Sequence, residues 1–364
     1  MSSGTGQPTV PDLLEAKRFC ICVGAGGVGK TTTAAAIAVG MAGRGLKVAV
    51  VTIDPARRLA DALGLDRLDN EARRVPSDHL DGLAQGGELW AVMLDPKRTF
   101  DDLIDRVAPS PARAAEIKRN GVYREISSAV SGSQEFTAIE KLYELSEGDF
   151  DLIVLDTPPA HNAAEFLSAP GRLTAFLGGS ALKVLMRPTG FGMRLLGIGA
   201  MPLLAGLKLV TGVDLLSDLT AFFTLLGGMT EEFDLRARRV QQLLHAPDTA
   251  FLLVTSAQDR PLEEAIWFRE NLRRDGLPFT GAIVNRVTNP VPRGEVPLDL
   301  PTDLAAAVDA CLADHAVLAE RDRANIERLR ASFDGEPILR VPDFTADVRD
   351  VEGLHAMHRE LFGD

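Results

Sequence analysis

The residues best suited to do chemistry form a glycine-rich stretch near the N-terminus. Residues 24–31 read G-A-G-G-V-G-K-T and match the pattern G-x-x-x-x-G-K-[ST]. Glycines in such a turn let backbone N–H groups approach phosphate oxygens, while Lys30 would neutralise phosphate charge and the Thr31 hydroxyl would ligate Mg²⁺. We therefore predict a nucleoside-triphosphate site, with Lys30 also catalytic, built from Gly26, Gly27, Val28, Gly29, Lys30, Thr31 and Thr32.

The same glycines also fit a dinucleotide-binding pattern. The spacing of Gly24, Gly26 and Gly29 matches G-x-G-x-x-G, and Asp54 lies near the end of the next predicted strand, where a ribose-binding acid would stand. A dinucleotide site needs neither a lysine nor a threonine at the start of the following helix. The pair Lys30-Thr31 therefore favours a nucleoside triphosphate.

Two aspartates at strand ends extend the predicted chemistry. Asp156 ends the predicted strand 151–155, and an acid in this position beside a phosphate loop holds Mg²⁺ through water. The structural alternative for Asp156 is a turn or helix-capping role. Asp54, which ends the run 47–53, is the candidate to orient an attacking water. We predict Thr31 and Asp156 as the metal-binding residues and Asp54 as catalytic.

The elements that must position these residues are strands alternating with helices. Apolar, β-branched runs predict strands, and helical patterns separate them. This alternation predicts an α/β fold with a parallel, helix-flanked sheet, so the strands' carboxyl ends would bring the aspartates and the glycine turn to one edge. The predicted strands are 19–23, 47–53, 88–94, 151–155, 250–256, 279–287 and 337–341.

Length and composition bound the domain organisation. The chain has 364 residues, which suits one large α/β domain over 18–364 behind a loose N-terminal tail, 1–17. A net charge of -12 argues against a general nucleic-acid binder. Three cysteines indicate a reducing compartment without a disulfide framework, and Cys20 and Cys22 are predicted to lie in the core.

A second informative stretch, 165–235, is predicted to interrupt the domain as a helical insertion. Only six charged residues lie between Thr174 and Thr230, together with half of the protein's eight methionines. Methionine-rich, adaptable surfaces suit a groove for hydrophobic ligands. The alternative is a buried helical subdomain or a dimer interface. No uncharged apolar run in it is long enough for a membrane span.

The motifs G-A-G-G-V-G-K-T, D-P-A-R-R and D-T-P-P-A-H-N together resemble the arsenical-pump ATPase and tail-anchored-protein targeting ATPase family, over most of the chain. This family belongs to the deviant Walker A group of P-loop proteins. The resemblance implies a cytoplasmic, dimeric ATPase that uses ATP and Mg²⁺ and binds a hydrophobic client helix or a membrane partner. It also implies that Asn285 contacts adenine, and that Pro342 and Asp343 lie beside the base and ribose.

The chain departs from this family at Ala25. Family members usually carry a lysine there that reaches across the dimer to the partner's phosphates, and alanine cannot neutralise charge. We therefore expect either a slow homodimer or a heterodimer with a lysine-bearing paralogue, unless Arg57 or Arg58 fills the gap. The family's arsenite-binding cysteines and zinc C-x-x-C are also missing. A client-coupled ATPase is thus favoured over an anion-pump energising subunit or a scaffold with little hydrolysis.

Overall fold

The computed structural model describes residues 8–53, 58–76, 86–121, 123–124, 127, 133–157, 221–222, 224–225, 229–291, 301–348 and 350–363. Asp54 and residues 158–220, which make up most of the predicted insertion, lie outside the described residues. The chain divides into two compact units. Unit 1 comprises Met1–Met93, Leu145–Ala163 and His245–Asp364, and unit 2 comprises Leu94–Glu144 and Ala164–Leu244.

Unit 1 is built on an eight-stranded sheet in the order β3-β4-β2-β5-β1-β6-β7-β8. All neighbouring strands pair in parallel except β3 and β4, which are antiparallel. The predicted α/β fold with a parallel sheet is confirmed. The strands are β1 Phe19–Val23, β2 Lys47–Thr52, β3 Arg73–Arg74, β4 Glu88–Met93, β5 Leu152–Asp156, β6 Thr249–Ser256, β7 Phe279–Val287 and β8 Ile338–Pro342.

The central strands are buried on both sides, which explains their continuous apolar sequences. Every residue of β1 and β5 is buried. Cys20 and Cys22 are fully buried in β1, so their predicted place in the core is confirmed. A side-chain hydrogen bond with Cys20, together with burial, raises the pKa of the Cys22 thiol well above its usual range. Both cysteines therefore contribute packing volume to the sheet.

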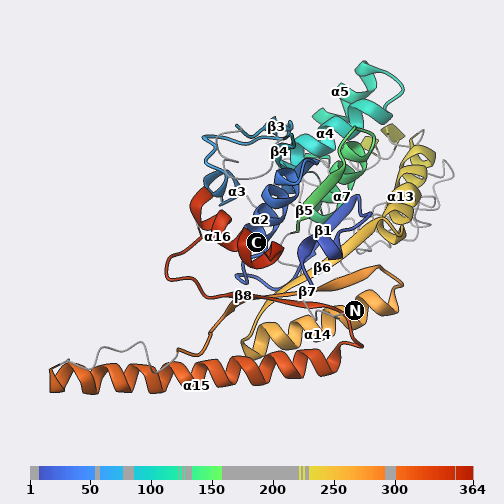
Figure 1. Ribbon diagram of the computed structural model, residues 1–364. Coiled ribbons are helices and arrows are strands. Elements are labelled where there is room, and N and C mark those ends of the chain that lie inside the picture. The colour runs from blue at the N-terminus through green and yellow to red at the C-terminus, as the bar shows by residue number, and fades with distance from the viewer. Residues whose placement is uncertain are drawn as a thin grey trace, which may run out of the picture. The chain divides into compact units, whose positions relative to one another are not determined.

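Helices cover both sides of the sheet in unit 1. Figure 1 shows α2 (Lys30–Gly43) and α16 (Val351–Phe362) together over one side, with α14 (Asp259–Arg274) and α15 (Thr302–Ser332) beside β6 and β7 on the other. The alanine-rich sequence of α2 permits its close packing, since 12 of its 14 residues are buried. At Gly40 an added Cβ would lie 2.3 Å from the Phe362 ring, so α2 and α16 pack with their backbones close together.

Unit 1 differs from the sequence prediction in two places. The predicted tail contains a short helix, α1 (Val10–Leu13), and its Val10 is fully buried. Residues 66–88, in which the sequence predicts no strand, contain β3, which forms an antiparallel edge on β4. Packing against distant elements, rather than local pattern, causes both differences. The helical sequence between β7 and β8 forms one continuous 31-residue helix, α15.

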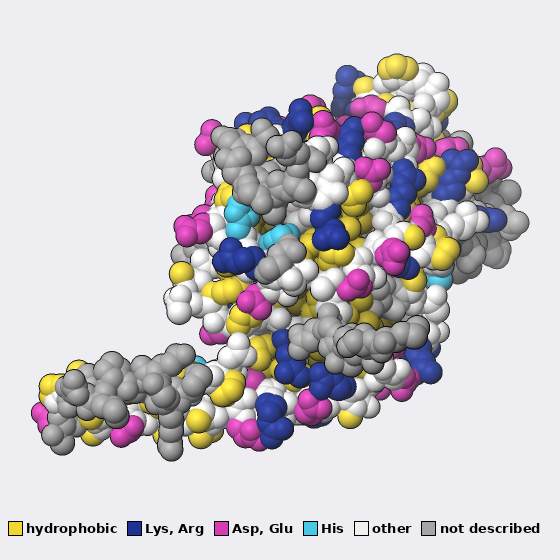
Figure 2. All heavy atoms as spheres, viewed as in Figure 1, with side chains coloured by type: hydrophobic (Ala, Val, Ile, Leu, Met, Phe, Trp, Pro, Cys, Tyr) yellow, Lys and Arg dark blue, Asp and Glu magenta, His cyan; other side chains and the backbone are white. Residues whose placement is uncertain are grey.

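The N-terminal half of α15 extends away from the sheet in Figure 1. Hydrophobic side chains show along this half in Figure 2, and Leu304, Val317 and Leu318 are 50%, 69% and 42% exposed. The C-terminal half is anchored by the buried side chains of Ile326 and Leu329. No helix among the described residues is long and apolar enough to cross a bilayer.

Unit 2 contains α4 (Pro96–Val107), α5 (Pro111–Arg119), most of α7 (Ser133–Ser146) and most of α13 (Thr230–His245). It thus includes residues 94–144, which the sequence assigned to the ATPase domain. The reason is a hydrophobic cluster in which α4 and α5 residues such as Phe100 and Ile117 pack with Phe222, Leu225 and Met229. The role of 165–235 as a separate insertion stays a prediction.

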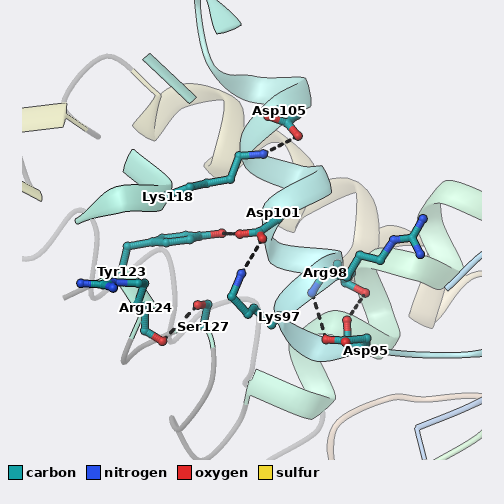
Figure 3. Close-up of polar contacts among 10 residues, drawn as sticks. Asp95, Lys97, Arg98, Asp101, Asp105, Lys118, Tyr123, Arg124 and Ser127 are labelled. Atoms are coloured by element: carbon teal, nitrogen blue, oxygen red, sulfur yellow. Dashed lines mark hydrogen bonds and ion pairs between the residues drawn. The ribbon is translucent and has the colours of Figure 1, made fainter. Parts of the chain in front are cut away.

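Polar contacts brace the first helices of unit 2 (Figure 3). Asp95 caps α4 by accepting from the Arg98 N–H at 3.0 Å, which satisfies a free donor of the first turn. The Tyr123 hydroxyl donates to Asp101 Oδ1 at 2.8 Å, and burial, with this acceptor, raises the pKa of Tyr123. Lys118 pairs with Asp105 at 2.5 Å and so ties α5 to α4. These contacts fix the two helices against one another.

A buried ion pair joins α7 to α13. The Arg236 guanidinium donates to Glu140 Oε1 at 2.5 Å and 3.1 Å, and the Glu140 side chain is only 4% exposed. Burial raises the pKa of Glu140, although Arg236 acts in the opposite direction. Because a lone buried charge is strongly destabilising, each partner requires the other. The pair therefore specifies how these two helices meet.

Candidate nucleotide-binding site

The glycine loop leaves β1 at its carboxyl end, and its backbone explains the glycines. Gly24 has φ of 147°, and a Cβ added there would lie 2.0 Å from the Val254 carbonyl oxygen of β6. Gly29 precedes α2 with φ of 92°, in the left-handed region that favours glycine. No atom of the described residues lies within 4 Å of the Cβ that Gly27 lacks, so the loop is open on that side. This geometry fits a phosphate cradle at a helix N-terminus.

Lys30 lies over this loop. Its Nζ donates to the Ala25 carbonyl oxygen at 2.7 Å, and the residue is only 7% exposed. The ammonium group is therefore held across the loop, close to where phosphate oxygens would be bound. A shielded cation beside converging backbone N–H groups is a strong anion site, because low solvent exposure strengthens the charge interaction.

The two predicted metal-binding residues are in direct contact. The Thr31 hydroxyl donates to Asp156 Oδ2 at 2.7 Å, and in the parallel pairing of β1 with β5 the partner of Asp156 is Cys22, two residues before the loop begins. When the Thr31 hydrogen is used in this way, its oxygen lone pairs stay available to a cation. Hydroxyl and carboxylate oxygens are what Mg²⁺ prefers, so these residues fit that ion.

Thr52 is a further residue of the candidate site, one not predicted from the sequence. It is 1% exposed at the end of β2, and its hydroxyl donates to the same Asp156 Oδ2 at 2.8 Å. β5 lies between β2 and β1, which brings Thr52 and Thr31 to the same carboxylate oxygen, Asp156 Oδ2. The sequence feature that could have identified Thr52 is its place as a polar residue at the carboxyl end of a buried strand, two positions before Asp54. Thr52 orients Asp156.

Asn285 lies near the end of β7 and is 6% exposed. Its Nδ2 donates to the Val28 carbonyl oxygen at 2.9 Å, which places this side chain against the glycine loop. Pro342 pairs with Val287 where β8 adjoins β7, and the Asp343 N–H donates to the Val287 carbonyl at 3.0 Å. The three residues predicted to lie beside the base and ribose therefore lie at the same edge of the sheet as the glycine loop.

The structure brings together most of the residues selected from the sequence. Gly26 to Thr32, Asp156 and Asn285 converge at the carboxyl ends of β1, β5 and β7, and Thr32 is half-buried in the first turn of α2. Asp54 and Arg57 lie outside the described residues, whereas Arg58 is exposed at the start of α3 (Arg58–Ala62). The individual roles of these residues stay predictions.

Comparison with known proteins agrees with this geometry. The family model described as anion-transporting ATPase matches residues 17–362. ATPase get3 of Schizosaccharomyces pombe is 24% identical over 357 residues, which cover 97% of this chain and 94% of that protein. ATPase get3 of Schizosaccharomyces japonicus is 28% identical over 165 residues, and ATPase GET3 of Ajellomyces dermatitidis is 30% identical over 178.

The last two matches cover 44% and 47% of this chain and about half of each relative, 47% and 49%. The family model, by contrast, extends over nearly the whole chain. This chain is therefore an ATPase of the anion-transporting ATPase family.

Proposed function

We propose that this chain binds ATP with Mg²⁺ and that, in a dimer, hydrolysis changes its affinity for a hydrophobic client helix or a membrane partner. The observation that supports this best is the convergence of Lys30, Thr31 and Asp156 at one sheet edge, with Thr31 and Asp156 in direct contact. The names of the relatives support the ATPase part of the proposal. We place this activity in the cytoplasm, at the surface of a membrane when a membrane partner is bound.

Each residue has a distinct task in this proposal. The N–H groups of the glycine loop bind phosphate oxygens, and Lys30 turns from the Ala25 carbonyl towards the terminal phosphates. Thr31 and Asp156 hold Mg²⁺, which offsets phosphate charge when bound, and Thr52 keeps the Asp156 carboxylate in place. Asp54 orients the attacking water. Asn285, Pro342 and Asp343 face the base and ribose.

The hydrophobic client is assigned to the insertion at 165–235. Its scarcity of charge and its methionines support an adaptable apolar groove. We expect a photoreactive probe introduced at Met193 or Met201 to crosslink to an apolar helical peptide several-fold more in one nucleotide state than in the other. A probe at exposed Val317 on α15 is the matched control. Crosslinking that is equal at all three positions, or independent of nucleotide, would contradict this assignment.

Ala25 supports a second candidate function, a nucleotide-gated scaffold that scarcely hydrolyses ATP. A homodimer of this chain lacks the family's cross-dimer lysine at both sites. Cations supplied in this way are worth roughly 10³–10⁵ in rate for related enzymes. If the homodimer hydrolyses ATP slowly for this reason, rapid hydrolysis requires a partner that supplies the lysine. We therefore propose that the rapidly hydrolysing form is a heterodimer with a lysine-bearing paralogue. In it the paralogue's lysine reaches the nucleotide held by this chain.

The prediction for Ala25→Lys follows directly. Turnover by the chain alone should rise at least about tenfold, because the new ammonium neutralises charge in the partner's site. Ala25→Met, which has similar length without charge, should leave the rate nearly unchanged. Adding the lysine-bearing paralogue to the unmodified chain should also accelerate hydrolysis. Brisk turnover by the unmodified homodimer that neither change affects would rule out the heterodimer.

A further inference from the structure

The side-chain amide of Asn285 is used at both ends by backbone groups. Nδ2 donates to the Val28 carbonyl oxygen of the glycine loop at 2.9 Å, and Oδ1 accepts from the Arg286 N–H at 3.0 Å. The residue is 6% exposed, and its bond to Val28 is buried, whereas the bond from Arg286 is part-buried. One amide therefore joins the end of β7 to the glycine loop, a segment 257 positions away in the sequence.

The glycine loop is shaped around this amide. A Cβ added to Gly29 would lie 2.3 Å from Asn285 Nδ2, far inside van der Waals contact. Gly29 also has φ of 92°, so a substituted residue would be strained in its own backbone as well. The absence of a side chain at Gly29 thus leaves the space in which Asn285 reaches Val28.

The end of β7 is also shaped to present the amide. Arg286 has φ of 58°, a left-handed conformation that is unfavourable for a non-glycine residue. The pairing of β7 with β8 shifts register between Val284 and Val287, the interval that contains both residues. Backbone strain of this kind persists where surrounding contacts hold it, and it gathers at functional sites. Here it accompanies the bond from the Arg286 N–H to Asn285.

From this geometry we propose that Asn285 is a positioning residue for phosphate binding. Its amide holds the loop at Val28 and Gly29 in the shape that receives phosphate oxygens, independently of any contact with a base. This inference rests on the proposed binding of nucleotide, and it assigns to Asn285 a role distinct from reading adenine. The two roles predict different responses to a ligand that has no base.

The experiment compares binding of MgATP and of base-free magnesium tripolyphosphate by the full chain. In Asn285→Ala we expect both dissociation constants to rise by a similar factor, about tenfold or more, because a shielded loop carbonyl loses its donor. Asn285→Asp keeps an acceptor for the Arg286 N–H but cannot donate to Val28 when ionised, so it should weaken both ligands as well. It has nearly the parent's shape and serves if the alanine variant fails to fold.

Arg286→Gly is the matched control. Glycine relieves the left-handed strain and keeps the N–H that Asn285 accepts, so both affinities should stay within about twofold of the parent. Hydrogen exchange without ligand provides an independent readout, since the Gly29 and Lys30 amides should exchange faster in Asn285→Ala but not in Arg286→Gly. A purely base-reading residue would leave these exchange rates unchanged.

The outcomes separate this inference from the proposed function. If the parent binds both ligands and Asn285→Ala weakens only MgATP, Asn285 reads the base and the positioning role is wrong, while nucleotide binding stands. Unchanged affinity for both ligands overturns the positioning role too. If the parent binds neither ligand, the proposed function fails, and with it this inference.

Discussion

Replacing Lys30 with alanine is expected to reduce ATP turnover by about 10²–10³-fold or more, the largest loss that we predict. Lys30 is 7% exposed and lies over the loop, with its Nζ 2.7 Å from the Ala25 carbonyl oxygen. Without it the phosphate charge loses its main side-chain partner in a site partly shielded from water. Equilibrium binding of ATP, together with steady-state phosphate release, measures the effect.

Two comparisons make this result specific. Lys17→Ala removes a lysine at the other end of β1, where its Nζ donates to the Pro247 carbonyl oxygen, and it should leave turnover unchanged. Asp54→Asn should spare ATP binding and slow only the turnover, because it removes the group proposed to orient water. A Lys30→Ala protein that binds and hydrolyses ATP like its parent would show that the glycine loop is not the phosphate site.

The second large effect is expected from Asp156→Asn. The variant keeps an oxygen that can accept from Thr31 and Thr52, now at 2.7 Å and 2.8 Å from Asp156 Oδ2, but it lacks the negative charge that attracts Mg²⁺. Groups that hold a metal through its water or its ligands are typically worth 10–100-fold in metal affinity or activity. We expect the Mg²⁺ concentration for half-maximal turnover to rise by about that factor.

The control is the same substitution at the other end of β5. Asp151 accepts from the Lys47 N–H at 2.8 Å, outside the site, so Asp151→Asn should leave the Mg²⁺ dependence unchanged. ATP binding measured without Mg²⁺ should survive in Asp156→Asn, because Lys30 and the loop are intact. An unaltered Mg²⁺ titration in Asp156→Asn would assign Asp156 the structural role of a turn residue instead.

Much of the fold follows from local sequence. The runs 19–23 and 279–287 coincide with β1 and β7, and the ends of the other predicted strands agree within one residue. The central strands β1, β2 and β5 are recognisable because both of their faces are buried, so the apolar run is continuous and glycine or aspartate ends it. Where burial depends on a distant partner, as at Val10 in α1 or Arg73–Arg74 in β3, local pattern carried no signal.

The residues of the candidate site fall into the same two groups, those that local sequence predicts and those that only long-range packing brings together. The amino-acid sequence alone determined the phosphate loop, because glycines, Lys30 and Thr31 within one turn act through local backbone geometry. Only the tertiary structure decided that β5 lies between β2 and β1, so that Thr52 and Thr31 meet on Asp156, and that Asn285 reaches Val28. Such contacts depend on strand order and on packing between segments far apart in the chain, which no local periodicity encodes.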